Sequence, residues 1–200
     1  MIPTIHDRAV VAGWLRLGAS AAPLLIGATL SRAVPAKPVP WMLPPRRIAT
    51  VCLPTGGGYL HARIAGAIDA DIRWPNKGTW CAGERKSDPA GVRVSFRGAI
   101  HDGHQLLFLF GLTGVREGRP LREGRANLTV IDESDGRIFG TLGDRRCTVD
   151  SLSQRRLPAA HSYRVEVHGF CTEPARAVHG TGDILVSRFD FAGPVNYADR

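Results

Sequence analysis

Two closely spaced histidines are the first candidates for chemistry in this chain of 200 residues. His101 and His104 flank Asp102 and Gly103, and two imidazoles with a carboxylate are ligands that suit zinc or copper. However, Asp-Gly favours the tight turn of a β-hairpin, where the two rings need not share a face. We therefore predict no metal site and no cofactor, and keep His101 and His104 as candidate ligand-binding residues at a hairpin tip.

Trp74 and Trp80 lie on either side of a predicted turn at 75–78 and are the second candidates. Indole rings stack on sugar rings or anchor a protein partner. The alternative for Trp74 is that it completes the apolar row of its strand and belongs to the core, whereas the direction of Trp80 stays open. Both are kept as candidate ligand-binding residues, with a glycan or an envelope protein as the partner.

No recognisable catalytic set accompanies these residues, because the chain has no Gly-x-Ser-x-Gly motif and its cysteines are better used in disulfides. Asp69 and Asp71 would stand about 7 Å apart on one strand face, a separation found in inverting glycoside hydrolases. Adjacent outward carboxylates are nevertheless common on strands. We predict no catalytic residues, and a secreted hydrolase with dispersed catalytic residues is the alternative.

Four cysteines with wide spacing predict two disulfides rather than a zinc ribbon, which needs paired CxxC motifs. If 146–153 and 162–171 form a hairpin with its tip near Ala159, Cys147 and Cys171 are equidistant from that tip. The same register places Val149 opposite Gly169 and Ser153 opposite Val165. The predicted bridges are Cys147–Cys171 and Cys52–Cys81, the second fastening a lead-in segment to the domain.

The N-terminal segment, residues 1–36, has the features of an export signal. An uncharged run at 17–31 follows Arg8 and Arg16, and its length suits a signal-peptide core but not a bilayer-spanning helix. Small residues then offer a cleavage site after Ala36, with Ala33 as the second choice. An uncleaved anchor or a buried helix is the alternative. We predict a periplasmic or secreted protein that meets the membrane only transiently, through this segment.

The elements that must position the candidate residues are short strands. Residues 37–59 are rich in Pro and Gly and predict an extended lead-in, and 60–200 form the single folded domain. From His61 to Trp74 apolar and polar residues alternate, as on a strand with one dry face. Three rows are predicted to point inward: Ile64/Ile68/Ile72, Val92/Val94/Phe96 and Tyr163/Val165/Val167.

Eight or nine such strands with turn-rich connections predict an all-β fold, an antiparallel β-sandwich, with a closed β-barrel as the alternative. Partner contacts are expected in two polar loops, 83–91 and 114–124. Leu106–Leu112 is predicted to be a central strand that is covered on both faces.

Composition and charge limit the function classes. With 44% hydrophobic residues, 23 Gly and 14 Pro, the chain is neither disordered nor a helical bundle. Its formal net charge is +8, but the arginines are scattered and never form a run of five, so no specific nucleic-acid binding is expected. The sequence therefore predicts an exported, disulfide-stabilised, non-catalytic binding module. A basic protein that binds anionic lipid or nucleic acid is a third hypothesis.

Overall fold

The computed structural model of the protein describes residues 50–87 and 90–198, which belong to one compact unit. The predicted signal segment and residues 37–49 of the lead-in lie outside this range. No helix occurs in the described part, which confirms the all-β prediction. There are eleven strands instead of eight or nine: β1 Tyr59–Gly66, β2 Ala70–Pro75, β3 Trp80–Lys86, β4 Gly91–Ala99, β5 Gln105–Thr113, β6 Gly124–Asp132, β7 Arg137–Gly140, β8 Cys147–Arg156, β9 Ser162–Cys171, β10 Ala175–Ala177 and β11 Asp183–Asn196.

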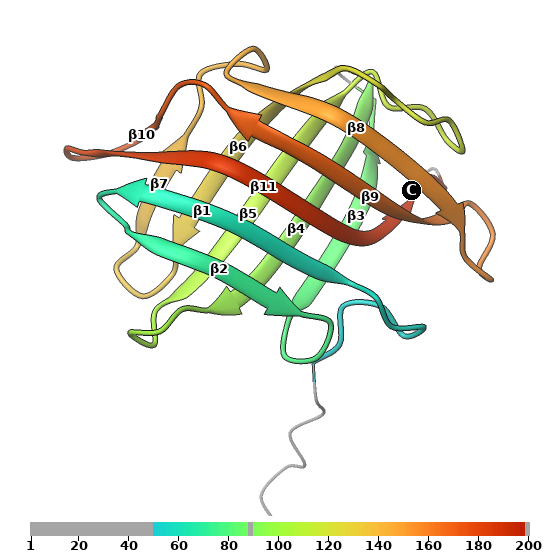
Figure 1. Cartoon of the computed structure of the whole chain (residues 1–200), viewed down its shortest axis with the longest axis horizontal. Coiled ribbons are helices and arrows are strands. Elements are labelled where there is room, and N and C mark those ends of the chain that lie inside the picture. Colours follow the sequence, from blue (N-terminus) through green and yellow to red (C-terminus); the bar gives the residue numbers. More distant parts are fainter. Residues whose placement is uncertain (1–49, 88–89, 199–200) are drawn as a thin grey trace, which may run out of the picture. The chain divides into compact units, whose positions relative to one another are not determined.

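The strands lie in two layers that are joined at their edges (Figure 1). One layer contains β2, β1, β11, β9 and β8 in that order, and the other contains β3 to β7. Neighbouring strands are antiparallel, except that β11 and β3 meet in parallel at one residue pair, Asn196 and Glu84. The layers are also linked by β8, which pairs with β6, and by β10, which pairs with β7 and β11. The antiparallel β-sandwich is thus confirmed, with hydrogen-bonded corners that make its two layers one continuous sheet.

Aromatic rings fill the space between the layers. The ring of Phe191 on β11 lies 4.7 Å from that of Phe110 on β5 and 5.2 Å from that of Phe96 on β4, measured between centroids. All residues of the three predicted inward rows are buried, except Tyr163, which is partly buried. A fully buried side chain of this size contributes about 1.5–3 kcal/mol. This central contact therefore holds the two layers face to face.

The stretch from His61 to Trp74, predicted as one alternating strand, is a hairpin of β1 and β2. Gly66 ends β1 with a φ of 117°, a backbone conformation that favours glycine, and Ile64 faces Ala70 across the hairpin. The turn leaves Ile68 and Ile72 buried on the same side as Ile64, so the alternation continues through the reversal. The prediction of a single strand was wrong, because buried and exposed residues alternate in the same way along one continuous strand and along this hairpin.

Two further boundaries differ from the prediction. The expected polar loop at 83–91 is largely strand, because β3 extends to Lys86 and pairs along its length with β4. The central strand β5 is covered on one face only. Phe108 and Phe110 are buried there, whereas Leu107 and Leu109 on the other face are partly exposed.

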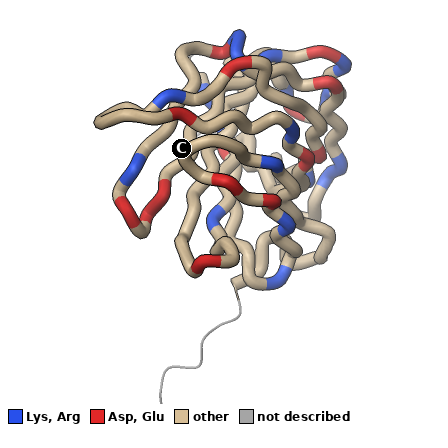
Figure 2. Tube along the Cα trace, turned by 60° about the vertical axis from the view of Figure 1, so that its left-hand side comes forward, with Lys and Arg blue, Asp and Glu red and all other residues tan. Residues whose placement is uncertain are grey.

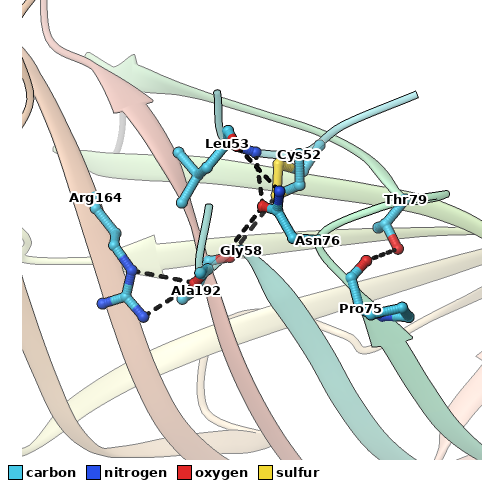
Figure 3. The surroundings of a disulfide bond; sticks show 10 residues. Cys52, Leu53, Gly58, Pro75, Asn76, Thr79, Arg164 and Ala192 are labelled. Carbon is cyan, nitrogen blue, oxygen red and sulfur yellow. Dashed lines mark hydrogen bonds between the residues drawn. A yellow bond between two sulfur atoms is a disulfide. The ribbon is translucent and has the colours of Figure 1, made fainter. Parts of the chain in front are cut away.

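The described part of the lead-in is fixed to the domain by the turn between β2 and β3 (Figure 3). Asn76 in this turn binds the lead-in through its backbone carbonyl, which accepts from the Cys52 amide at 2.9 Å, and through its side chain. The Asn76 Oδ1 atom accepts from the amide of Gly58 at 2.8 Å, where a Cβ atom would lie 2.6 Å from that oxygen. Leu53 is buried, so this segment is part of the core and not a free tether.

Both predicted disulfides are present, Cys52–Cys81 and Cys147–Cys171. Cys147 faces Cys171 and Val149 faces Gly169, as predicted. Nearer the tip, however, Ser153 faces Glu166 and not Val165. The register shifts between Val149 and Ser151, so Asp150 is the extra residue of a β-bulge, which no symmetric hairpin predicts.

Candidate ligand-binding cleft

A cleft of about 930 Å³ lies between the edge strand β2 and the tip of the β4–β5 hairpin. It brings together two of the four candidate ligand-binding residues, Trp74 and His101. The first comes from β2 and the second from the turn after β4. The lining residues are Arg63, Asp69, Ala70, Asp71, Ile72, Arg73, Trp74, Ala99, Ile100, His101 and Asp102.

Trp74 forms an inner wall of the cleft. Its side chain packs edge-on against Phe108, with ring centroids 5.5 Å apart, and its Nε1 donates to the carbonyl of Ala99 at 2.7 Å. The ring passes over Gly98, where any Cβ atom would lie 2.6 Å from two ring carbons. Since only 6% of Trp74 is exposed, it belongs to the core and fixes the hairpin tip; it offers little surface for stacking a sugar.

Two arginine–aspartate pairs form the floor of the cleft. Arg63 donates to both carboxylate oxygens of Asp69, at 2.6 and 3.1 Å. Arg73 donates twice to Oδ2 of Asp71, at 3.2 and 3.0 Å. Each of the two carboxylates considered for glycoside hydrolysis is therefore hydrogen-bonded to an arginine. The four side chains are exposed and offer hydrogen-bond donors and acceptors to a ligand.

The polar surface continues from the cleft across the layer. A smaller depression of about 260 Å³ shares Arg63, Asp71 and Arg73 with the cleft and adds His61, Arg188 and Asp190. The carboxylate of Asp190 accepts from Arg188 Nε at 2.8 Å and lies 2.8 Å from Nδ1 of His168 on β9. Hydrogen-bonding groups thus extend from β2 over β1 and β11 to β9.

His104 contacts a different group of residues from His101. Its Nδ1 lies 3.2 Å from Oδ2 of Asp132, the buried last residue of β6. Arg137 donates to the same oxygen at 3.0 Å, and the backbone amides of Ser134 and Asp135 donate to Oδ1 of Asp132. The β6–β7 turn and the β4–β5 tip are therefore joined through one carboxylate.

This network also fixes the charges of its members. Burial alone would raise the pKa of Asp132, but hydrogen bonds from Arg137 and His104 hold it below its usual value. The hydrogen bond to Asp132 raises the pKa of His104. His104, Asp132 and Asp135 are close enough to hold a cation, yet Arg137 lies within 3.1 Å of both carboxylates and already supplies the positive charge.

The lining of the cleft does not include Trp80, His161 or His168. Trp80 is 44% exposed and faces Arg97 across β3 and β4, on the strand face opposite to its buried neighbour Cys81. His161 pairs with Glu117, whereas His168 pairs with Asp190, so these two imidazoles do not share a ligand. Of the sequence candidates, Trp74 and His101 are brought together, and Trp80 and His104 are placed elsewhere.

Comparisons with models of protein families, with curated proteins and with solved structures gave no match. Within the described residues, no helix is long and apolar enough to cross a membrane.

Sequence reasoning missed several residues of the polar surface and its supports. Arg63 and Arg73 were assigned to the wet face of a strand, without the pairing to Asp69 and Asp71 that the structure shows. Asp132 was missed as well, although an acid that ends an apolar strand just before a turn is a usable signal. Such an acid caps the turn through its carboxylate, as Asp132 does here.

Proposed function

We propose that this protein is exported and acts by binding, without catalysis, and that its cleft holds a neutral glycan at the envelope or outside the cell. Two disulfides in an all-β fold support the first part, because such bonds form and persist in oxidising compartments. They also supply stability to a domain that has to survive outside the cytosol.

The observation that carries the choice of ligand is the paired arrangement of Arg63 with Asp69 and of Arg73 with Asp71. Guanidinium and carboxylate groups are planar, and each presents several hydrogen-bonding atoms in fixed directions. Neighbouring hydroxyls of a sugar present donors and acceptors at similar spacing. Because each arginine is balanced by an aspartate, the cleft gives little net attraction to a polyanion, which favours an uncharged glycan.

An envelope protein, the other predicted partner, is less well matched by this cleft. Protein interfaces are usually centred on a well-packed aromatic or arginine anchor that becomes fully desolvated. The aromatic residue of the cleft, Trp74, is already buried in its own domain, and the arginines are engaged by aspartates. A glycan needs only the polar groups that the cleft presents.

The binding proposal is tested by affinity electrophoresis of the oxidised protein in gels that contain dextran, laminarin or glucomannan. At least one neutral polysaccharide should retard the protein, and the double variant Arg73→Ala/His101→Ala should restore free migration. Lys77→Ala, an exposed residue of the adjacent turn, is the matched control and should remain retarded. Free migration of the wild type in all three gels would overturn the glycan proposal.

Export is tested separately by the intact mass of the protein recovered from outside the cytosol. The expected mass lacks residues 1–36 and four hydrogens, one pair for each disulfide. An intact N-terminus together with four free thiols on a cytosolic product would contradict export without bearing on the ligand.

A further inference from the structure

A second surface, on a different part of the molecule, gathers arginines that are scattered in the sequence. Residues 114–123 connect β5 to β6, and we call them the arginine loop because Arg116, Arg119 and Arg122 occur in them at intervals of three. In Figure 1 this loop runs beside β8 at the upper right. Its Leu121 exchanges two backbone hydrogen bonds with Leu152 of β8, at 2.9 and 2.8 Å.

One side chain, Gln154 on β8, holds the arginine loop in place. Its Nε2 donates to the carbonyls of Arg116 and Arg119, at 2.8 and 2.7 Å, and its Oε1 accepts from the amide of Gly118 at 3.3 Å. The same oxygen accepts from the hydroxyl of the buried Tyr197 at 2.8 Å. Both donors and both acceptor positions of the amide are in use, so the loop backbone has a defined position relative to β8.

One more arginine lies beside this support. Arg156 is two positions after Gln154 on β8, so its exposed side chain shares the strand face of Gln154, whereas Arg155 points to the other face. Arg116, Arg119, Arg122 and Arg156 form what we call the arginine platform. None of these four guanidinium groups makes an ion pair with another described residue. Charges of both signs are interspersed over much of the chain trace (Figure 2).

The acidic residues near the platform do not cancel its charge. The arginine loop contains two glutamates, Glu117 and Glu123, and the first already lies 3.1 Å from Nδ1 of His161. Four arginines therefore outnumber the two glutamates over a segment whose backbone is held by Gln154. Guanidinium groups form bidentate, charge-assisted hydrogen bonds with carboxylate, sulfate and phosphate groups. The platform is accordingly suited to a ligand with repeated negative charges.

The surroundings of the platform favour one class of polyanion. The exposed large hydrophobic residues of the described chain are Val51, Trp80, Leu142 and Val178, and none of them belongs to the arginine loop or to β8. A platform without an apolar anchor is poorly suited to insertion at a lipid surface, and one without an exposed aromatic lacks the ring on which unpaired bases stack. An acidic polysaccharide requires neither. We propose that the arginine platform binds a carboxylated or sulfated polysaccharide, independently of the cleft.

The test measures binding of the oxidised protein to heparin oligosaccharides and to oligogalacturonate over a series of salt concentrations. The variant Arg116→Gln/Arg119→Gln/Arg156→Gln should bind about tenfold more weakly at moderate salt, and the slope of log affinity against log salt should fall by about two. The matched control Lys77→Gln/Arg145→Gln/Arg176→Gln removes the same charge from exposed positions elsewhere. It should stay within about twofold of the wild type.

A charge-neutral variant separates a built site from general attraction. Gln154→Ala keeps every arginine but removes the amide that fixes the loop, so heparin binding should weaken about threefold or more while the net charge is unchanged. Thermal unfolding of each variant verifies that the sandwich is intact. The proposal would be overturned if the two triple variants lost heparin binding equally, or if Gln154→Ala had no effect on heparin binding.

Two further probes decide between classes of polyanion. Vesicles that contain anionic lipid and single-stranded DNA should both bind more weakly than heparin at the same salt concentration. Tighter binding to either one would overturn the choice of a polysaccharide. The cleft variant Arg73→Ala/His101→Ala should bind heparin normally, so failure of the platform and failure of the cleft give different results.

Discussion

The side-chain amide of Asn76 binds the backbone of Leu53 in both directions, donating from Nδ2 to the carbonyl at 3.1 Å and accepting at Oδ1 from the amide at 3.0 Å. The same Oδ1 also accepts from Gly58, so one turn residue completes the hydrogen bonding of a segment 18 to 23 positions earlier in the chain. This contact and the neighbouring Cys52–Cys81 disulfide both fasten the lead-in to the domain (Figure 3).

Replacement of Asn76 by Ala should lower the free energy of unfolding by about 2–3 kcal/mol, because it leaves partly buried backbone groups of Leu53 and Gly58 without partners. Urea unfolding measures the change. Lys77→Ala, at the exposed neighbouring position, should change the stability by less than about 0.5 kcal/mol. Equal midpoints for the two variants would show that the Asn76 contacts do not stabilise the fold.

Removal of the Cys147–Cys171 bridge, by changing both residues to Ser, should destabilise the protein by about 3–4 kcal/mol for a loop of this length. Its two cysteines are separated by 24 positions and those of Cys52–Cys81 by 29, so the chain-entropy effect should be similar for the two bridges. Only the loss of Cys52–Cys81 should raise hydrogen exchange at residues 50–58. Increased exchange at residues 50–58 in both double variants would contradict the prediction that only the Cys52–Cys81 bridge holds this segment.

Gly98→Ala should disturb the wall of the cleft, because the added Cβ atom would meet the ring of Trp74 at 2.6 Å. We expect a loss of about 1–3 kcal/mol, as for other overpacked sites, and altered tryptophan fluorescence as the Nε1 bond to Ala99 is displaced. Gly140→Ala is the control, since its Cβ atom would meet only Thr129, at 3.9 Å. Unchanged fluorescence and stability in Gly98→Ala would show that the β4–β5 hairpin can shift to accommodate the added methyl group.

The contact between His104 and Asp132 should make the stability depend on pH in both directions. The raised pKa of His104 means that protonated His104 stabilises the fold below its unfolded pKa of about 6.5, and that this contribution is lost as the pH rises through the folded pKa. The lowered pKa of Asp132 stabilises the fold above its unfolded pKa of about 3.9, and that contribution is lost as the pH falls through the folded pKa.

Wild type and His104→Gln should therefore differ most in urea midpoint near pH 5, and the difference should shrink as the solution becomes alkaline. His179→Gln, at an exposed position, should follow the wild type throughout. A gap between wild type and His104→Gln that stays constant from pH 5 to 8 would exclude titration of His104 as its cause.

The fold class could be predicted from the alternation of apolar and polar residues, and Cys147–Cys171 from the symmetry of a hairpin. Cys52–Cys81 then followed as the remaining pair. The pairing of Cys147 with Cys171 was right because their side of the bulge at Asp150 keeps the register of a symmetric hairpin. Nearer the tip, the extra residue moved Ser153 opposite Glu166. Gly66 was a visible sign of the β1–β2 hairpin, but the alternation across it hid the reversal.

The polar sites were harder to predict because they are formed between strands that are distant in sequence. Asp132 meets His104 over 28 positions, and Gln154 meets the carbonyl of Arg116 over 38. Arginines that are evenly scattered along the chain gather when the loop at 114–123 lies against β8. No single-sequence pattern records such neighbours, whereas Trp74 and His101 were found because each belongs to a local turn signal.

The strand β11 has a consequence for how the molecule is made. It is the last described strand in chain order, and β1, β3, β9 and β10 all pair with it. Until this segment has been made, each of these earlier strands lacks a neighbour. The pairings of β9 and β10 with β11 are local, whereas that of β1 joins residues as distant as Tyr59 and Ala192. The sandwich therefore cannot close until β11 has been made, and closing it depends on contacts between distant segments, which form slowly.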